Sequence, residues 1–237
     1  MISIKTIASS SAGNCYRVSD NETILLLEAG VNFKLLQKEM MYKVTSVSGC
    51  LISHEHQDHA KAVRDLIQVG IDCYMSEGTA KALNVYGNSR VKIVSAGEVF
   101  RIGSWKLMAF DLNHDCEEPL GFLLCSNKTG EKLVFITDTY YVKHKFQGLN
   151  YIMIECNYAT DILTNNVINN IVSESMRSRI VKSHLSLENC KEFLRANDLS
   201  DVKEIYLLHL SDNNSDEVRF KKEVCEVSGR LVYVANK

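Results

Sequence analysis

The segment His54-Glu55-His56-Gln57-Asp58-His59 places three imidazoles and the Asp58 carboxylate between an apolar run at 49–53 and a run of helical spacing at 60–69. Alternate side chains of an extended chain share a face, so His54 and His56 can reach one cation together. Asp58 stands where a helix N-cap is expected, and the chain turns there. That turn would aim Asp58 and His59 at a second cation about 3.5–4 Å from the first.

The donor types of this segment indicate the class of metal. Neutral imidazole and carboxylate suit Zn, Mn or Fe better than Ca or Mg. A solvated histidine-rich turn is the alternative interpretation, but three histidines at this spacing with Asp58 favour a metal site. Glu55 and Gln57 have the opposite parity, so we expect them to face outward or to support the ligands.

The composition is typical of a globular cytosolic protein. The 237 residues can bury a substantial core, and the eight cysteines are scattered without a Cys-x-x-Cys pair. This pattern predicts reduced thiols and a cytoplasmic location. We expect neither secretion nor a membrane span, because no leader pattern and no run of about 18 apolar residues is present. The net charge of −2 gives no general attraction to nucleic acid, so any such binding needs a local patch.

Strand-like and helix-like patterns are interspersed along the chain. Strands are expected at 3–7, 15–18, 23–27, 49–53, 71–75, 91–94, 99–102, 105–112, 120–126, 133–136, 151–155, 205–210 and 231–234. Helices are expected at 32–41, 60–69, 77–84, 162–172, 187–196 and 216–227. Residues 8–14 are expected to form a small-residue loop, either an anion-binding backbone or an ordinary turn. With one proline and no linker, this order predicts a single α/β domain over 1–237.

Four more residues with metal-binding or acid–base side chains stand near strand or helix ends: His114, Asp138, His184 and His209. Each alone is more consistent with a structural role. Rigid scaffolds aim such residues inward, however, and six of the seven histidines belong to these positions or to the motif. Because two cations need more than four ligands, the joint pattern favours a shared metal site.

The order His54-x-His56-x-Asp58-His59, His114, Asp138 and His209 resembles the metallo-β-lactamase superfamily over nearly the whole chain. The similarity is greatest to the WalJ/YycJ-type bacterial metallo-hydrolases. Residues 8–14 are similar to the opening Ser/Gly loop of that branch, and Ile136-Thr137-Asp138-Thr139 to its Asp motif. Two His-Leu-Ser motifs, at His184 and His209, complete the resemblance.

The resemblance implies an αββα four-layer sandwich with two divalent metal ions at one edge of two facing sheets. It implies that one ion is bound by His54, His56 and His114. The other would be bound by Asp58, His59 and His209, with Asp138 as the bridge. His184 matches a proton donor of related phosphodiesterases, and members of the branch are described as DNA exonucleases working from the 5′ end.

Two positions depart from the family pattern. The superfamily usually has Asp at the end of its second strand, where this chain has Glu28. The branch commonly has Asn-His after the strand at 151–155, where this chain has Asn157-Tyr158. The first change concerns a residue behind the ligands, and the second bears on the substrate class.

These features predict a dinuclear phosphodiesterase, a DNA exonuclease with a metal-bridging hydroxide as nucleophile and Asp58 and His184 as catalytic residues. Cations flanking the Asp138 and His184 motifs are candidates for holding the nucleic-acid backbone or a merely solvated surface: Lys143, Lys145, Arg177, Arg179 and Lys182. One alternative is a metallo-hydrolase of a small cyclic phosphodiester, a lactone or a thioester. A non-catalytic metal-binding regulatory protein is a second, and the intact ligand set argues against it.

Overall fold

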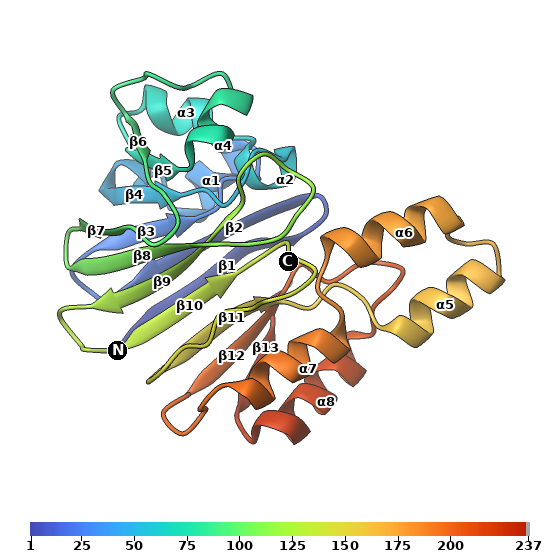
Figure 1. Ribbon diagram of the computed structural model, residues 1–237. Helices are drawn as coiled ribbons and strands as arrows, with labels where there is room; N and C mark the ends of the chain where they lie inside the picture. Colours follow the sequence, from blue (N-terminus) through green and yellow to red (C-terminus); the bar gives the residue numbers. More distant parts are fainter. Residues whose placement is uncertain (236–237) are drawn as a thin grey trace. The chain divides into compact units, whose positions relative to one another are not determined.

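The computed structural model describes residues 1–235, which fall into two compact units coloured along the chain in Figure 1. Unit 1 comprises Met1–Asp111 and Cys116–Glu131, and unit 2 comprises Leu112–Asp115 and Lys132–Ala235. The expected single domain over 1–237 therefore stays a prediction, and its last two residues lie outside the described part.

Unit 1 contains a six-stranded sheet in the order β1-β2-β3-β4-β5-β6. The strands are β1 Ser3–Ser10, β2 Gly13–Ser19, β3 Ile24–Leu27, β4 Val47–Leu51, β5 Cys73–Met75 and β6 Val91–Ile93. The pairs β1/β2 and β2/β3 are antiparallel, and the pairs from β3 to β6 are parallel. The apolar run before the histidine motif is thus an inner strand, β4, and the motif follows its carboxyl end.

Helices cover this sheet through one apolar core. They are α1 Phe33–Glu39, α2 Gln57–Ala60, α3 Val63–Gln68 and α4 Glu77–Ala82, with a 3₁₀ turn at Val44–Ser46. Leu36 of α1 and Leu66 of α3 are fully buried in one cluster with Leu26 of β3. Side chains cap two of these helices, because Asn32 accepts from Lys34 N and Ser76 accepts from Thr79 N.

Unit 1 also contains three antiparallel strands, β7 Val99–Ile102, β8 Trp105–Asp111 and β9 Leu120–Ser126. The buried Trp105 ring donates from Nε1 to the carbonyl of Thr23 at 3.2 Å, next to the start of β3. The hydroxyls of Ser104 and Ser126 both donate to Asp20. These buried contacts fasten the three strands to the β2–β3 corner.

Unit 2 contains the parallel strands β10 Lys132–Ile136, β11 Tyr151–Glu155, β12 Glu204–Leu208 and β13 Leu231–Val234. Its helices are α5 Thr160–Ile168, α6 Glu174–Ser183, α7 Leu187–Ala196 and α8 Glu217–Ser228. Figure 1 shows α7 and α8 side by side along β12 and β13, and α5 with α6 as a separate helical pair. A small core of Tyr158, Leu163 and Val172 holds that pair.

The sequence predicts most elements within two residues, and three regions differ in detail. Residues 8–14 form the ordinary hairpin turn that was one of the two alternatives, but it is tighter than expected, with Ser10 paired to Gly13 and only two residues in the turn. The helix expected at 60–69 begins three residues later as α3, and a separate short helix, α2, precedes it. The helix α6 was not expected, because its sequence has no continuous apolar stripe and only Ser183 in it is buried.

The cysteines and the lengths of the helices can be compared with the sequence over all described residues. The eight cysteines, all within residues 1–235, are thiols and not disulfides, as their scattering predicts. None of the helices in these residues has the length and apolar character that crossing a membrane requires.

Candidate metal centre

His54 and His56 follow the carboxyl end of β4 in unit 1. The fully buried His54 ring has its Nδ1 2.8 Å from the hydroxyl of Ser53, which orients the ring. Its Nε2 lies 3.2 Å from Nδ1 of His56, with the two rings edge to face. Two ring nitrogens therefore converge on one point, as the alternation along an extended chain predicts.

Asp58 and His59 lie in the first turn of α2, and here the expected helix cap is wrong. The N-cap of α2 is His56, which makes no side-chain cap bond, and Asp58 is already helical. The helix stops early because Ala62 donates its N–H to the carbonyl of Ala29 at 2.8 Å instead of continuing the helix. The short helix leaves Nε2 of His59 3.2 Å from Oδ2 of Asp58.

The turn after β3 supports α2 from behind. Glu28 is fully buried with φ near +65°, accepts from Ser53 N at 3.1 Å and lies 3.5 Å from Nδ1 of His59. Burial raises the pKa of the Glu28 carboxyl, although contacts from His59 and Ser53 oppose this. Gly30 is required by close approach, since a Cβ there would lie 1.6 Å from the carbonyl oxygen of Asp58.

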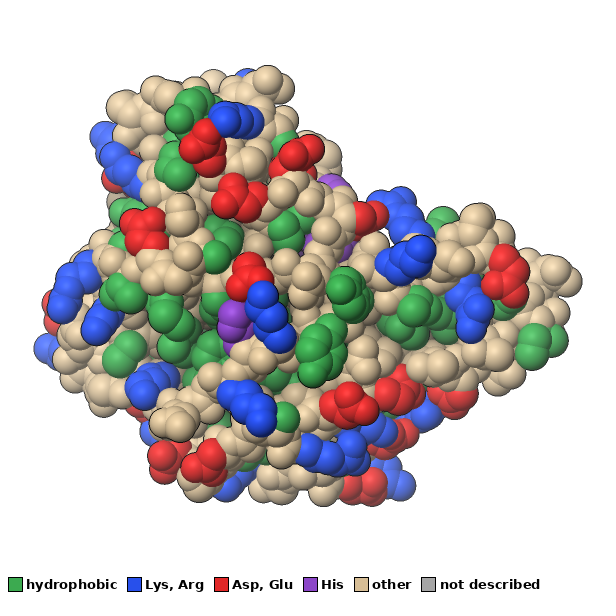
Figure 2. Space-filling model, in the orientation of Figure 1, with side chains coloured by type: hydrophobic (Ala, Val, Ile, Leu, Met, Phe, Trp, Pro, Cys, Tyr) green, Lys and Arg blue, Asp and Glu red, His purple; other side chains and the backbone are tan. Residues whose placement is uncertain are grey.

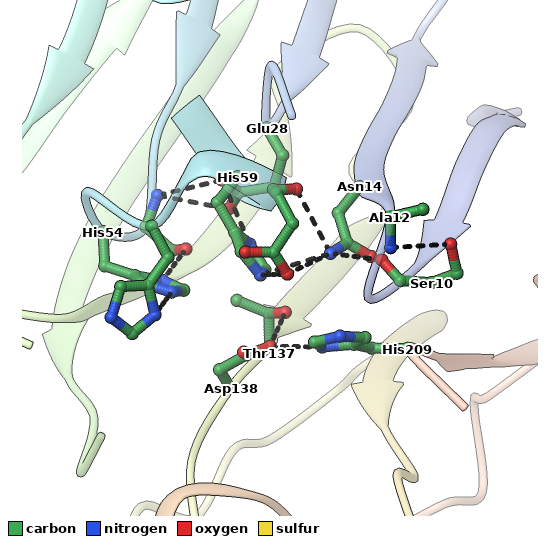
Figure 3. Close-up of polar contacts among 12 residues, drawn as sticks. Ser10, Ala12, Asn14, Glu28, His54, His59, Thr137, Asp138 and His209 are labelled. Atoms are coloured by element: carbon green, nitrogen blue, oxygen red, sulfur yellow. Dashed lines mark hydrogen bonds and ion pairs between the residues drawn. The ribbon is translucent and has the colours of Figure 1, made fainter. Parts of the chain in front are cut away.

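In unit 2, Asp138 and His209 follow the carboxyl ends of β10 and β12, two strands that both pair with β11. Nδ1 of His209 lies 2.7 Å from Oδ1 of Asp138, which also accepts from the hydroxyl of Thr137 at 3.0 Å. Figure 3 shows this contact and the neighbouring contact from Thr137 to Asp138. Both residues are almost completely buried, so these parallel strands hold their side chains on a rigid edge.

Glu155, the last residue of β11, was not predicted as a functional residue. Its Oε1 lies 2.6 Å from Nδ1 of His184, and its Oε2 accepts from the backbone N–H of Leu185 and Thr139. Donor atoms of Asp138, Glu155, His184 and His209 all lie within 4.8 Å of one another. The sequence signal was present, since Glu155 is the one charged residue in an otherwise apolar strand that is buried throughout.

Electrostatics distinguish His184, the C-cap of α6, from His114, which follows β8 and contacts the last residue of α6. Burial disfavours charge on His184, but the Glu155 carboxylate outweighs it and the pKa rises to about 9. His114 donates from Nδ1 to the carbonyl of Ser183, 2.7 Å away, and burial lowers the pKa of His114. Nε2 of His114 lies 3.6 Å from Oδ2 of Asp138, so the two could share a cation.

Each unit thus gathers its own part of the predicted set. Unit 1 brings together His54, His56, Asp58 and His59, and unit 2 brings together His114, Asp138, His184 and His209. Gln57 is exposed, as expected, whereas Glu55 is half-buried and accepts from the backbone N–H of Glu117. The metal-binding groups are imidazole and carboxylate on buried or partly buried side chains, a chemistry that fits transition-metal cations.

Comparison with known proteins places the fold in a family. Residues 23–210 match the family described as the β-lactamase superfamily domain. The solved metallo-β-lactamase fold protein YhfI from Bacillus subtilis superposes with a TM-score of 0.71 at 15% identity, covering 100% of this chain and 97% of that one. The chain therefore belongs to the metallo-β-lactamase superfamily, and the expected α/β sandwich is confirmed.

Curated relatives narrow the assignment. The exodeoxyribonuclease YycJ of Bacillus anthracis is 31% identical over 90% of this chain and 84% of its own length. The exodeoxyribonuclease WalJ of Streptococcus pneumoniae serotype 2 is 28% identical over 88% of this chain and 81% of its own length. The chain is a member of the YycJ/WalJ branch, as its motifs indicate, and a metal-dependent hydrolase.

Proposed function

We propose that this protein is a dinuclear metal-dependent phosphodiesterase, and specifically an exonuclease that degrades DNA from the 5′ end in the cytoplasm. The similarity to curated exodeoxyribonucleases over most of both chains supports the substrate class. The observation that carries the proposal is the contact between Glu155 and His184 beside Asp138 and His209. It supplies an acid–base group that metal binding alone would not need.

We propose that two groups of ligands hold two divalent cations of the Zn, Mn or Fe class. His54, His56 and His114 would hold one cation, Asp58, His59 and His209 would hold the other, and Asp138 would contribute to both. The short separations within each unit support this, at 3.2 Å for His54 with His56 and 2.7 Å for Asp138 with His209. In each pair, both atoms are of a type that can donate a lone pair to a metal ion.

The protein's own residues then divide the work. When bound, two such cations supply a nucleophile at neutral pH by lowering the pKa of water from 15.7 toward about 7, and they stabilise phosphoryl charge. Asp58 would help to hold the second of these cations. The Nδ1–H of His184 donates a hydrogen bond to Glu155. When the ring is charged, Nε2 carries a second proton, which it can give to the leaving alkoxide.

Basic residues near these elements are proposed to hold the phosphate backbone. Figure 2 shows Lys and Arg side chains on the outer surface of α6 in unit 2. Arg179 is 66% exposed and bonds Asp115 at 3.1 Å, next to His114, while Lys182 lies in the last turn before His184. Lys143, Lys145 and Arg177 extend the set on the same unit, the first two exposed and the third half-buried. Phosphate contacts of this kind position a substrate without reading its sequence.

A substrate comparison tests this function. Protein stripped by a chelator is reloaded with Zn²⁺, Mn²⁺ or Fe²⁺ and given linear DNA, linear RNA, a cyclic mononucleotide, a lactone and a thioester. The proposal predicts mononucleotide release from DNA, abolished by chelation and restored by metal. Preference for the cyclic mononucleotide, the lactone or the thioester would instead establish the alternative hydrolase, and metal binding without turnover would indicate a regulatory protein.

A further inference from the structure

Asn14, at the start of β2, is fully buried against two of the proposed ligands in the same unit (Figure 3). Its amide nitrogen lies 3.2 Å from Nε2 of His59 and 3.4 Å from Oδ2 of Asp58. Those two atoms are themselves 3.2 Å apart. An N–H donor, the positive end of a dipole, therefore stands next to both atoms that a cation would bind.

The amide of Asn14 can face only this way. The nitrogen also lies 3.2 Å from the carbonyl oxygen of Ser10 and 3.3 Å from that of Asp58, so a flipped amide would set its oxygen against two carbonyls and a carboxylate. From the other side, the hydroxyl of Tyr16 donates to Oδ1 of Asn14 at 3.2 Å. The same hydroxyl is 2.7 Å from Oγ of the buried Ser9, so it too is held in place.

The imidazole of His59 is oriented from both sides. Its Nδ1 lies 3.5 Å from the carboxylate of Glu28, and its Nε2 faces the Asn14 amide. The carboxylate can only accept, which favours a proton on Nδ1 of His59. The amide N–H can only donate, which favours a lone pair on Nε2. This is the tautomer that offers Nε2 to a metal.

We propose that Asn14 is a positioning residue, held by Tyr16, that keeps Asp58 and His59 in their metal-binding arrangement before a cation arrives. The NH₂ group of Asn14 has two protons and four nearby acceptors, so it cannot make a full hydrogen bond to all four at once. When a cation takes Nε2 of His59 and Oδ2 of Asp58, both protons still have partners in the carbonyls of Ser10 and Asp58. The inference rests on the proposed function only for the assignment of Asp58 and His59 as ligands.

The first test uses metal-free protein and needs no turnover. The ¹⁵N chemical shifts of the His59 ring report which nitrogen carries the proton. The proposal expects the Nδ1–H tautomer in the wild type and a mixture of tautomers in Asn14→Ala. A wild-type ring protonated on Nε2, or a tautomer that does not change in Asn14→Ala, would overturn it.

The second test follows metal binding by titration of metal-free protein with Mn²⁺ or Co²⁺. Loss of residues behind metal ligands costs about 10- to 100-fold in affinity, so Asn14→Ala should weaken one of the two ions by that factor and leave the other unchanged. Tyr16→Phe keeps the ring and every ligand, and it should weaken the same ion by a smaller factor. Tyr74→Phe, a conservative change at a ring stacked on Phe100, is the matched control and should alter neither ion.

Equal weakening of both ions in Asn14→Ala, or no effect of Tyr16→Phe, would contradict positioning through this pair. Tyr16→Phe also guards against misfolding, because it removes one oxygen and opens no backbone contact. The two proposals can fail separately. If the wild type shows the expected tautomer and Asn14→Ala selectively weakens one ion, the role of Asn14 is supported. If the wild type then fails to cleave DNA, only the proposed nuclease activity is contradicted.

Discussion

Oε1 of Glu155 and Nδ1 of His184 lie 2.6 Å apart, a short distance typical of a charge-assisted hydrogen bond. Glu155 is fully buried, and its second oxygen is occupied by two backbone N–H groups, so it is fixed as an acceptor. The bond therefore sets the ring of His184 with Nε2 directed away from Glu155. An imidazole held and charged in this way can donate a proton to a leaving group.

His184→Ala should keep its metals but lose cleavage of poor leaving groups. No proposed coordination shell needs His184, and removal of a general acid typically costs about 10²- to 10⁴-fold. A DNA 3′ oxygen needs that proton, whereas nitrophenolate leaves without one. Rates on DNA and on bis(nitrophenyl) phosphate, together with metal content, measure the difference. Equal losses on both substrates would mean that His184 binds substrate or metal.

The stability of the metal-free protein should fall as pH rises through about 9. The pKa of His184 is about 9 in the folded chain and about 6.5 for an ordinary histidine, so the folded state binds the proton more tightly. Its stabilising contribution is complete below pH about 6.5 and is lost as pH rises through about 9. Denaturant unfolding of wild type and His184→Gln from pH 6 to 10 measures this. Parallel curves for the two proteins would show that the Glu155 contact does not shift the pKa.

The sequence predicts more of the site than of its supports. His54, His56 and Asp58 are recognisable because ligand spacing survives in the chain order. The sequence marks Glu155 as the one charged residue of an apolar strand, but its partners follow only from the pairing of β11 between β10 and β12, which brings it near Asp138 and His209. The break between α2 and α3 is equally hidden, since it depends on a hydrogen bond from Ala62 to the distant Ala29.

Asp58→Ala should reduce turnover more than it reduces metal content. In the proposed arrangement, the cation at His54 and His56 would keep its protein ligands, whereas the cation at His59 would lose one and would contribute less to activation of the nucleophile. Elemental analysis beside a kinetic assay on DNA gives both quantities, and about one ion per chain should remain. Loss of both ions together would show that the sites load cooperatively.

Gly30→Ala should destabilise the protein and weaken metal binding together. The new Cβ would lie 1.6 Å from the carbonyl oxygen of Asp58 and 2.7 Å from the backbone nitrogen of His59, so α2 must move. Overpacking of this kind costs about 1–3 kcal/mol or more. Gly97→Ala is the control, because open space surrounds it and only its positive φ opposes the change. Thermal unfolding and metal titration of both variants measure the changes in stability and in metal affinity. Unchanged metal affinity in Gly30→Ala would contradict the packing argument.

The most direct test of the nuclease assignment is digestion of linear DNA labelled at either the 5′ or the 3′ end by metal-reconstituted protein. Samples withdrawn during the reaction are separated by length, with chelated protein and His184→Ala as controls. The proposed activity predicts that the 5′ label appears at once as mononucleotide while the 3′ label remains on progressively shorter strands. Release of internal fragments, early loss of the 3′ label alone, or no cleavage by fully loaded protein would contradict it.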